Sequence, residues 1–416
     1  MSNYEKAIKS PVAEGGMGWY AIDQREIDAV TAVLRNPKQM FRYVEGSQSG
    51  LLEKELCEKL GVGHALFVNS GTSALACCLG GFGIGTGDEV IVPGYTYIAT
   101  ASACIEVGAV PIIAEIDDSL SLDPQDVERK ITPLTKAIIV VHMQGVPGQM
   151  DAIRAIGKKH NLRVIEDSCQ AIGSKYRGKY TGVESDAFAW SLNYFKVLTC
   201  GEGGVFFSNS NEAYARAYYQ SDPAGEMWYT GMTPKDVNVN IFTRSCFRGN
   251  EMAAAVMRVQ LAKLDGMLGK TRSLKKTLLS HLNKPIHYKC QHVDDPEGDC
   301  GISFAIIAND RALCEPFTAA LEREGLAVGD VAYRNNFPDR HVYYYWDALI
   351  GDHKGSIQNY PWNNPLYKGN AAYTKEMCPR TMDILSRCIR LPIHLALTEQ
   401  NMIEFADAIN KADASL

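Results

Sequence analysis

The 416-residue sequence has few of the features that mark membrane, nucleic-acid-binding or secreted proteins. No segment approaches the roughly eighteen uninterrupted apolar residues of a membrane-spanning helix, and the N-terminal MSNYEKAIKSPVAEGG carries charges where a secretory signal needs an apolar core. No long run of Lys and Arg occurs, and 48 acidic against 42 basic residues leave a net charge of -6. We therefore expect a cytoplasmic protein without a nucleic-acid or membrane partner.

Cysteine motifs are also absent, although cysteine itself is not. The twelve cysteines are scattered and form no Cys-x-x-Cys pair, so a disulfide framework or a zinc finger matches poorly. His287, Cys290 and His292 lie close together, but their spacing fits no common zinc pattern. We predict reduced thiols and no metal site.

The apolar residues, 46% of the chain, are enough to bury a large core, and their pattern indicates an α/β fold. Between residues 63 and 209, seven short apolar runs alternate with helix-like segments, which is typical of a largely parallel sheet. The runs are HALFVNS, EVIVPGY, VPIIAEI, KAIIVVHM, RVIED, DAFAWSL and GGVFFSN. A long helix is expected from about residue 250 to 282, followed by a smaller α/β unit with an aromatic-rich insertion at 334–373. We predict two domains, residues 1–250 and 251–416.

A phosphate cradle is the first candidate for chemistry. The stretch Asn69-Ser70-Gly71-Thr72-Ser73-Ala74 falls where a strand ends and a helix begins, and the unpaired N–H groups and positive dipole end of a helix N-terminus attract phosphate. An ordinary Ser/Thr helix cap explains the same residues about as well. No Gly-Lys-Ser/Thr follows, and the glycines at 80–87 fit no Gly-x-Gly-x-x-Gly register, so nucleotide and dinucleotide loops are excluded.

A pair of acids and a lysine are the other two candidates. Glu166 and Asp167 end an apolar strand, where ligands of open α/β sheets bind, although a helix cap is a serious alternative. Lys196 lies between an apolar strand and the turn Gly201-Glu202-Gly203-Gly204. Partial desolvation there would make it a competent Schiff-base amine, whereas a single lysine is more often a surface residue with a buried stem.

These three features together are what pyridoxal 5'-phosphate (PLP) requires. The cradle binds the phosphate, the lysine binds the aldehyde, and the acid keeps the pyridine nitrogen protonated so that the ring can accept electrons. The sequence also resembles the DegT/StrS-like sugar aminotransferases, which are PLP enzymes with the aspartate aminotransferase fold, fold type I. Motifs in a specific order carry this resemblance over nearly the whole chain: NSGTSAL, GDEVIVPGYTYIAT, TPLTKAIIVVHMQG, VIEDSCQAIGSKYRGKYTG, SLNYFKVLTCGEGG and LPIH.

The resemblance implies a large PLP-binding domain with a mostly parallel seven-stranded sheet, a smaller C-terminal α/β domain, and a homodimer with active sites at the subunit interface. It implies that Lys196 holds the cofactor and transfers protons, that Asp167 pairs with the pyridine nitrogen, and that Tyr97 stacks on the ring. Gln170 matches the residue near the ring hydroxyl. The residues that match the phosphate contacts are Gly71, Thr72, Ser73 and Ser191. Taken singly, Tyr97 could instead be a core residue, Gln170 a cap and Ser191 a strand-end hydroxyl.

One motif departs from the family pattern. The family usually has GxNxRMxExxAA near the start of the long helix, and its Asn reaches the phosphate bound by the neighbouring subunit. Aligning Arg248 and Glu251 with that motif places Cys246 at the Asn position and Arg244 at the Gly position. The cross-subunit contact is therefore expected to differ, with Arg244 or Asn250 as alternative donors.

We expect an aminotransferase that converts a keto or aldehyde sugar, or a cyclitol, to an amine, with L-glutamate or L-glutamine as the donor. Candidates for the substrate side are Phe41-Arg42-Tyr43, the residues His341, Tyr343, Tyr344, Tyr345 and Trp346, and the segment Pro361-Trp362-Asn363-Asn364-Pro365; core packing is the alternative. One rival hypothesis is dehydration, elimination or cyclisation by a PLP enzyme of the same fold; Lys196 argues against the family's 3-dehydratase branch, which carries histidine there. The other is a non-catalytic PLP-binding regulator, which the acidic charge and the lack of a DNA-binding segment disfavour.

Overall fold

A computed structural model describes residues 5–229, 231–326, 340–351 and 359–416. A seven-stranded sheet forms its centre, in the order β1-β9-β8-β5-β4-β2-β3. Only β9 runs antiparallel to its neighbours, β1 and β8; the other neighbouring pairs are parallel. The strands are β1 (His64–Val68), β2 (Glu89–Pro93), β3 (Val110–Ala114), β4 (Thr135–Val141), β5 (Arg163–Asp167), β8 (Ala187–Ser191) and β9 (Gly204–Ser208). All seven predicted strands and the α/β fold class are confirmed.

Helices cover both faces of this sheet, because successive residues of each strand point to opposite sides. Ile165 belongs to the core beneath α3 (Gly71–Gly81), α4 (Ala99–Glu106) and α7 (Asn211–Ser221). Its neighbour Val164 belongs to the core beneath α5 (Pro124–Lys130) and α6 (Met150–His160). The same opposite face, nearer β1, is covered by α2 (Gln48–Leu60) and α9 (Glu251–Ser280). For the same reason, two adjacent polar residues at the end of a strand point to opposite faces of the sheet.

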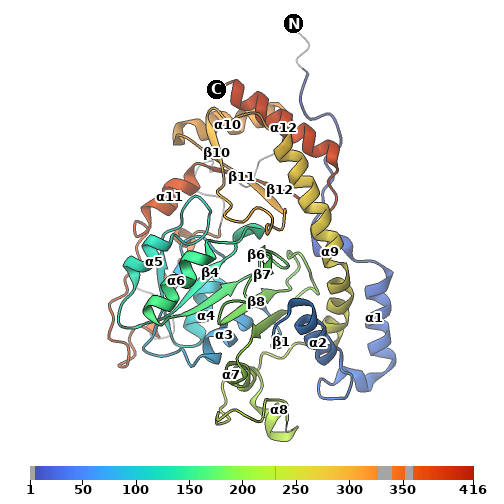
Figure 1. Cartoon of the computed structure of the whole chain (residues 1–416), viewed down its shortest axis with the longest axis vertical. Helices are drawn as coiled ribbons and strands as arrows, with labels where there is room; N and C mark the ends of the chain where they lie inside the picture. The colour runs from blue at the N-terminus through green and yellow to red at the C-terminus, as the bar shows by residue number, and fades with distance from the viewer. Residues whose placement is uncertain (1–4, 230, 327–339, 352–358) are drawn as a thin grey trace.

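The helix α9 connects the large sheet to a smaller one (Figure 1). Asn250 caps it by accepting the N–H of Ala253 at 2.9 Å, and α9 packs on α1 (Gln24–Arg35), α2 and α12 (Glu399–Ala414). The smaller sheet is antiparallel, in the order β10 (Tyr288–Cys290), β11 (Ser303–Ala308) and β12 (Cys388–Pro392). With α10 (Arg311–Arg323) and α12 it forms a second core. The boundary predicted after residue 250 coincides with the start of α9; the division into two domains stays a prediction.

Several short elements complete the described chain. They are η1 (Gly18–Ala21), η2 (Pro37–Met40), η3 (Met143–Gly145), β6 (Lys175–Tyr176), β7 (Lys179–Tyr180), α8 (Pro223–Trp228), η4 (Tyr343–Tyr345) and α11 (Pro379–Ser386). Within the predicted insertion, residues 334–339 and 352–358 lie outside the described residues. Tyr343 and Trp346 are buried in the core of the large sheet, so core packing accounts for both. Over the described ranges, none of the helices has the length and apolar character needed to cross a membrane.

Candidate active site

A cavity of about 490 Å³ opens where the parallel strands of the large sheet have their carboxyl ends. It is lined by Ser70, Gly71, Thr72, Leu75, Thr96, Tyr97, Ala99, Thr100, Val141, Asp167, Cys169, Gln170, Ser191, Asn193, Phe195, Lys196, Glu202 and His341. These residues come from six separate segments of the chain. The fold therefore brings together seven of the eight residues expected to bind PLP, all but Ser73.

The N-terminus of α3 forms one wall of the cavity. Ser70 caps the helix by accepting the N–H of Ser73 at 3.1 Å, which leaves the N–H groups of Gly71 and Thr72 without an acceptor inside the helix. A methyl group on Gly71 would lie 2.6 Å from Cβ of Ser191 and 3.1 Å from Sγ of Cys169. Only glycine lets this helix end approach the β8 terminus so closely, and the two free amides suit an anion.

Ser73 is oriented differently from its expected partners. Its hydroxyl donates to Oδ1 of Asn69 at 2.7 Å and lies 2.9 Å from Oγ of Ser70. These bonds hold the hydroxyl within the turn that precedes α3, and Ser73 does not line the cavity. Its contact with a phosphate stays a prediction.

Asp167 lies at the end of β5 and faces the cavity almost fully buried. Its Oδ2 accepts the hydroxyl proton of Thr100 at 2.8 Å, and its Oδ1 accepts the N–H of Cys169 at 3.1 Å. The two bonds fix the carboxylate from both oxygens. Thr100 was not among the expected site residues, and in the sequence nothing distinguishes it from the neighbouring polar residue Ser102.

The neighbouring acid, Glu166, points to the other face of the sheet. Its Oε2 accepts a hydrogen bond of 2.8 Å from Nε2 of His142. Nδ1 of His142 accepts the N–H of Gly148 at 3.1 Å, so both ring nitrogens of His142 have partners. Burial alone would raise the pKa of the Glu166 carboxyl, but the bonds from His142 and Ser185 outweigh burial and lower it. Of the two adjacent acids, Asp167 is therefore the one that can reach a ligand in the cavity.

Lys196 lies in the loop between β8 and β9, and several contacts hold its backbone. Its N–H donates to the carbonyl of Asn193 at 3.0 Å, and its own carbonyl accepts the N–H of Gly18 at 3.0 Å. The ring of Trp19 stacks on Tyr194 with 5.7 Å between centroids. No described residue forms a hydrogen bond or an ion pair with Nζ of Lys196, so the amine at this end of a well-held loop is available to a ligand.

The remaining predicted residues lie at the mouth and at the side of the cavity. Tyr97 has 56% of its surface exposed, and its ring lies 5.9 Å from that of His341. Oε1 of Gln170 accepts the N–H of Gln144 at 3.3 Å. His341, from the C-terminal insertion, also lines the cavity; its role toward a substrate stays a prediction.

Other substrate-side candidates lie elsewhere in this chain. The rings of Phe41 and Tyr43 pack on Tyr229, with centroid distances of 5.6 and 4.7 Å. Arg42 pairs with Glu53 at 2.5 Å. None of them lines the cavity.

Two of the three residues at the departing motif form hydrogen bonds within the chain. The guanidinium of Arg244 donates to the carbonyl of Glu106 at 2.9 Å, Asn250 caps α9, and Cys246 is exposed. None of the three lines the cavity of its own chain. The carboxamide oxygen of Asn250 caps α9, so its NH2 group is the part that could donate to a phosphate.

The donor set fits PLP. Two free amides at a helix N-terminus suit a phosphate, a buried carboxylate suits a pyridinium nitrogen, and an unpartnered lysine amine suits an aldehyde. The glycine at position 71 leaves space where any side chain would fill the cradle.

Known proteins are similar to this chain in sequence and in fold. The sequence pattern of the DegT/DnrJ/EryC1/StrS aminotransferase family matches residues 20–349. The chain belongs to this family. Its relatives in the DegT/DnrJ/EryC1/StrS family include proteins with a named activity and proteins of solved structure.

A dTDP-3-amino-3,4,6-trideoxy-alpha-D-glucose transaminase of Streptomyces venezuelae is 39% identical over 243 residues, which are 58% of this chain and 62% of that protein. An L-glutamine:2-deoxy-scyllo-inosose aminotransferase of Streptoalloteichus tenebrarius is 36% identical over 249 residues, 58% of each chain. The alignments thus span less than two thirds of either relative. The crystal structure of S. venezuelae DesV is similar over 94% of both chains, with a TM-score of 0.72 and 28% identity.

Proposed function

We propose that this protein is a PLP-dependent aminotransferase that converts a keto or aldehyde sugar, or a cyclitol, to the corresponding amine. L-glutamate or L-glutamine is the amino donor. Family membership, the activities for which the two relatives are named and the donor set of the cavity support this function. The observation that carries it is the meeting of Lys196, Asp167 and the α3 N-terminus in one cavity.

In this proposal each wall of the cavity has a distinct task. Bound PLP supplies an electron sink that stabilises negative charge at the carbon next to the amine. The amides of Gly71 and Thr72 hold the phosphate, and Ser191 lies beside them at the end of β8. Asp167, fixed by Thr100, keeps a proton on the pyridine nitrogen. Tyr97 covers one face of the ring.

Lys196 has two tasks. Its Nζ would hold the aldehyde of PLP in the resting enzyme. The same amine, when free, would act as the general base and acid that moves a proton at the α-carbon of the amino donor. An amine without any competing ion pair is suited to both tasks because no carboxylate needs to be displaced first.

The absorption spectrum of the PLP-loaded protein tests this function. We expect a visible band that bleaches on addition of L-glutamate or L-glutamine, with formation of the 2-oxo acid in an amount equal to the bound cofactor. The Lys196→Ala variant should still bind PLP, but without the band of the lysine-linked form and without turnover. A band that ignores both donors would contradict transamination and favour elimination, dehydration or a regulator; no band in the parent protein would contradict the cofactor assignment.

We also propose a homodimer in which a second copy covers the cavity mouth. Large apolar side chains are exposed, including Phe195, which lines the cavity, at 78% and Trp228, at the end of α8, at 76%, and such surfaces are typical of protein interfaces. Light scattering coupled to size-exclusion chromatography should give the mass of two chains. A Trp228→Asp variant should shift the protein toward the monomer, and a monomeric parent protein would contradict the proposal.

A further inference from the structure

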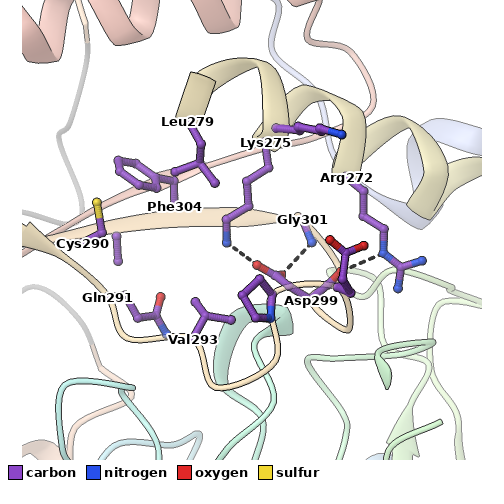
Figure 2. Close-up of a pocket in the computed structure, with 13 residues that line it drawn as sticks. Arg272, Lys275, Leu279, Cys290, Gln291, Val293, Asp299, Gly301 and Phe304 are labelled. Atoms are coloured by element: carbon purple, nitrogen blue, oxygen red, sulfur yellow. Dashed lines mark hydrogen bonds and ion pairs between the residues drawn. The ribbon is translucent and has the colours of Figure 1, made fainter. Parts of the chain in front are cut away.

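A second cavity, of about 500 Å³, lies between the C-terminal half of α9 and the β10–β11 connection. It shares no lining residue with the active-site cavity. Figure 2 shows Lys275 extending from α9 into this hollow, with Phe304 and Leu279 on one side and Val293 and Gln291 below. Its volume falls in the range of roughly 300–1,000 Å³ that small-molecule sites occupy.

A buried ion pair lies at the inner end of the hollow. Lys275 is only 8% exposed, and its ammonium pairs with one carboxylate oxygen of Asp299. The other oxygen of Asp299 accepts the N–H of Gly301 at 2.7 Å, so this acid is fully engaged. An ammonium has three donors, and the described residues offer Lys275 no acceptor besides Asp299. Unused N–H groups of a buried cation therefore remain at the cavity.

The charges around the hollow favour an anion. Three cationic side chains line it, Arg272, Lys275 and Lys276, against two acidic ones, Glu297 and Asp299. Nε of Arg272 donates to the carbonyl of Asp299 at 2.7 Å, not to a carboxylate. No described acid pairs with Lys276. Lys275 and Asp299 pair with each other. The charges that remain are those of the cations Arg272 and Lys276 and of the exposed carboxylate of Glu297.

Apart from Gln291, whose amide donates to the carbonyl of Ser119 at 2.7 Å, the rest of the lining is mostly apolar. Leu279, Val293, Pro296, Phe304 and Ala305 line the hollow with the thiol of Cys290. Apolar walls with a few convergent polar groups are the usual composition of a ligand pocket. An ion pair that served only to anchor α9 would need no such hollow beside it.

We propose that this cavity is a second binding site, for a small amphipathic monoanion with an apolar ring or branched chain and one carboxylate. The carboxylate accepts hydrogen bonds from Lys275 and is attracted by Lys276, while the apolar body contacts Phe304, Leu279 and Val293. This site does not depend on the proposed aminotransferase activity, because no residue is shared.

Isothermal titration calorimetry of the PLP-loaded protein tests the site with naphthylacetate as the probe and the neutral naphthylacetamide as its isostere. We expect one molecule of naphthylacetate per chain, bound at least about tenfold more tightly than the amide. No saturable binding of naphthylacetate, or equal binding of both compounds, would overturn the proposal.

Variants locate the bound probe. Val293→Trp and Leu279→Trp each place a large ring in the hollow without touching the ion pair, and each should abolish binding. Lys276→Glu should weaken naphthylacetate binding several-fold, whereas Lys284→Glu, the same charge change at an exposed residue outside the lining, should not. Thermal unfolding of each variant establishes that it is folded. Unchanged binding in both folded Trp variants would place the probe elsewhere and refute the site.

Discussion

Gly71 offers the most direct test of the phosphate cradle, because one methyl group changes both packing and the space for a ligand. In Gly71→Ala the new Cβ would lie 2.6 Å from Cβ of Ser191 and 3.1 Å from Sγ of Cys169. Both neighbours are buried at the end of the sheet, so neither can move freely. Forcing extra carbon into such a place costs about 1–3 kcal/mol, and the better helix propensity of alanine returns at most about 0.5–1 kcal/mol.

The expected net loss in unfolding free energy is therefore about 1 kcal/mol, the difference between the middles of these two ranges, measured by urea denaturation of the cofactor-free protein. If helix and strand separate to relieve the contact, the amides of Gly71 and Thr72 no longer converge with Lys196. We expect the Kd for PLP to rise about tenfold, which corresponds to about 1.4 kcal/mol.

Gly269→Ala is the matched control. Gly269 also lies in a helix, but a Cβ there would meet nothing within 4 Å. This variant should gain about 0.5–1 kcal/mol of stability, with no change in PLP affinity. The contrast separates the cost of crowding from the general effect of replacing glycine.

A double mutant identifies Ser191 as the obstacle. Ser191→Gly removes the Cβ that would meet the new methyl group, so the double variant Gly71→Ala, Ser191→Gly should be more stable than the sum of the single effects by at least about 0.5 kcal/mol. The reasoning would be refuted by a Gly71→Ala variant as stable as the parent, or by strictly additive effects.

Three further predictions follow from single contacts. Thr100→Val removes the hydroxyl that donates to Asp167 and should lower the unfolding free energy by about 1–3 kcal/mol and weaken PLP binding in a fluorescence titration; unchanged values of both would contradict the positioning role. Burial raises the pKa of Glu166, but the bond from His142 outweighs it, so the folded pKa lies below the unfolded value of 4.5. The ionised Glu166 therefore stabilises the folded protein above about pH 4.5, and this stabilisation is lost as the pH falls. Between about pH 5 and 3 the urea midpoint of the parent protein should fall more than that of Glu166→Gln, which has no such carboxylate. Parallel curves of midpoint against pH would refute this. In Asn250→Ala the α9 cap is missing, so the unfolding free energy should fall by about 1 kcal/mol, whereas Asn250→Asp keeps the cap and the stability. PLP affinity should stay constant in both variants. A loss of affinity would instead support a contact between Asn250 and the phosphate.

The seven strands were predictable because each is buried on both faces and reads as an apolar run. The long helix was predictable because its buried residues recur at helical spacing, as do Leu261, Leu264 and Leu268. The gathering of site residues followed from one geometric rule, that the carboxyl ends of parallel strands meet at one edge of a sheet. Hence Asp167 and Ser191, which are 24 positions apart in the chain, line the same cavity.

Other features depended on contacts between distant segments. The role of Thr100 required α4 to lie over the end of β5, and the orientation of Ser73 depended on Asn69 being within reach of its hydroxyl. The position of Arg42 outside the cavity depended on its pairing with Glu53. No local pattern encodes these partners, because side-chain rotamers and packing are set only when the elements meet.

The sequence by itself determined the fold class, the family and the residue types of the candidate site, because periodicity and motif order are local properties of the chain. Only the tertiary structure decided which of the adjacent acids, Glu166 or Asp167, faces the cavity, since the faces of a strand are distinguished by what packs on each. It also decided that Lys275, one lysine of a helical run, is buried beside a hollow. That hollow exists because α9 and the β10–β11 connection, brought together by the smaller sheet, do not fill the space between them.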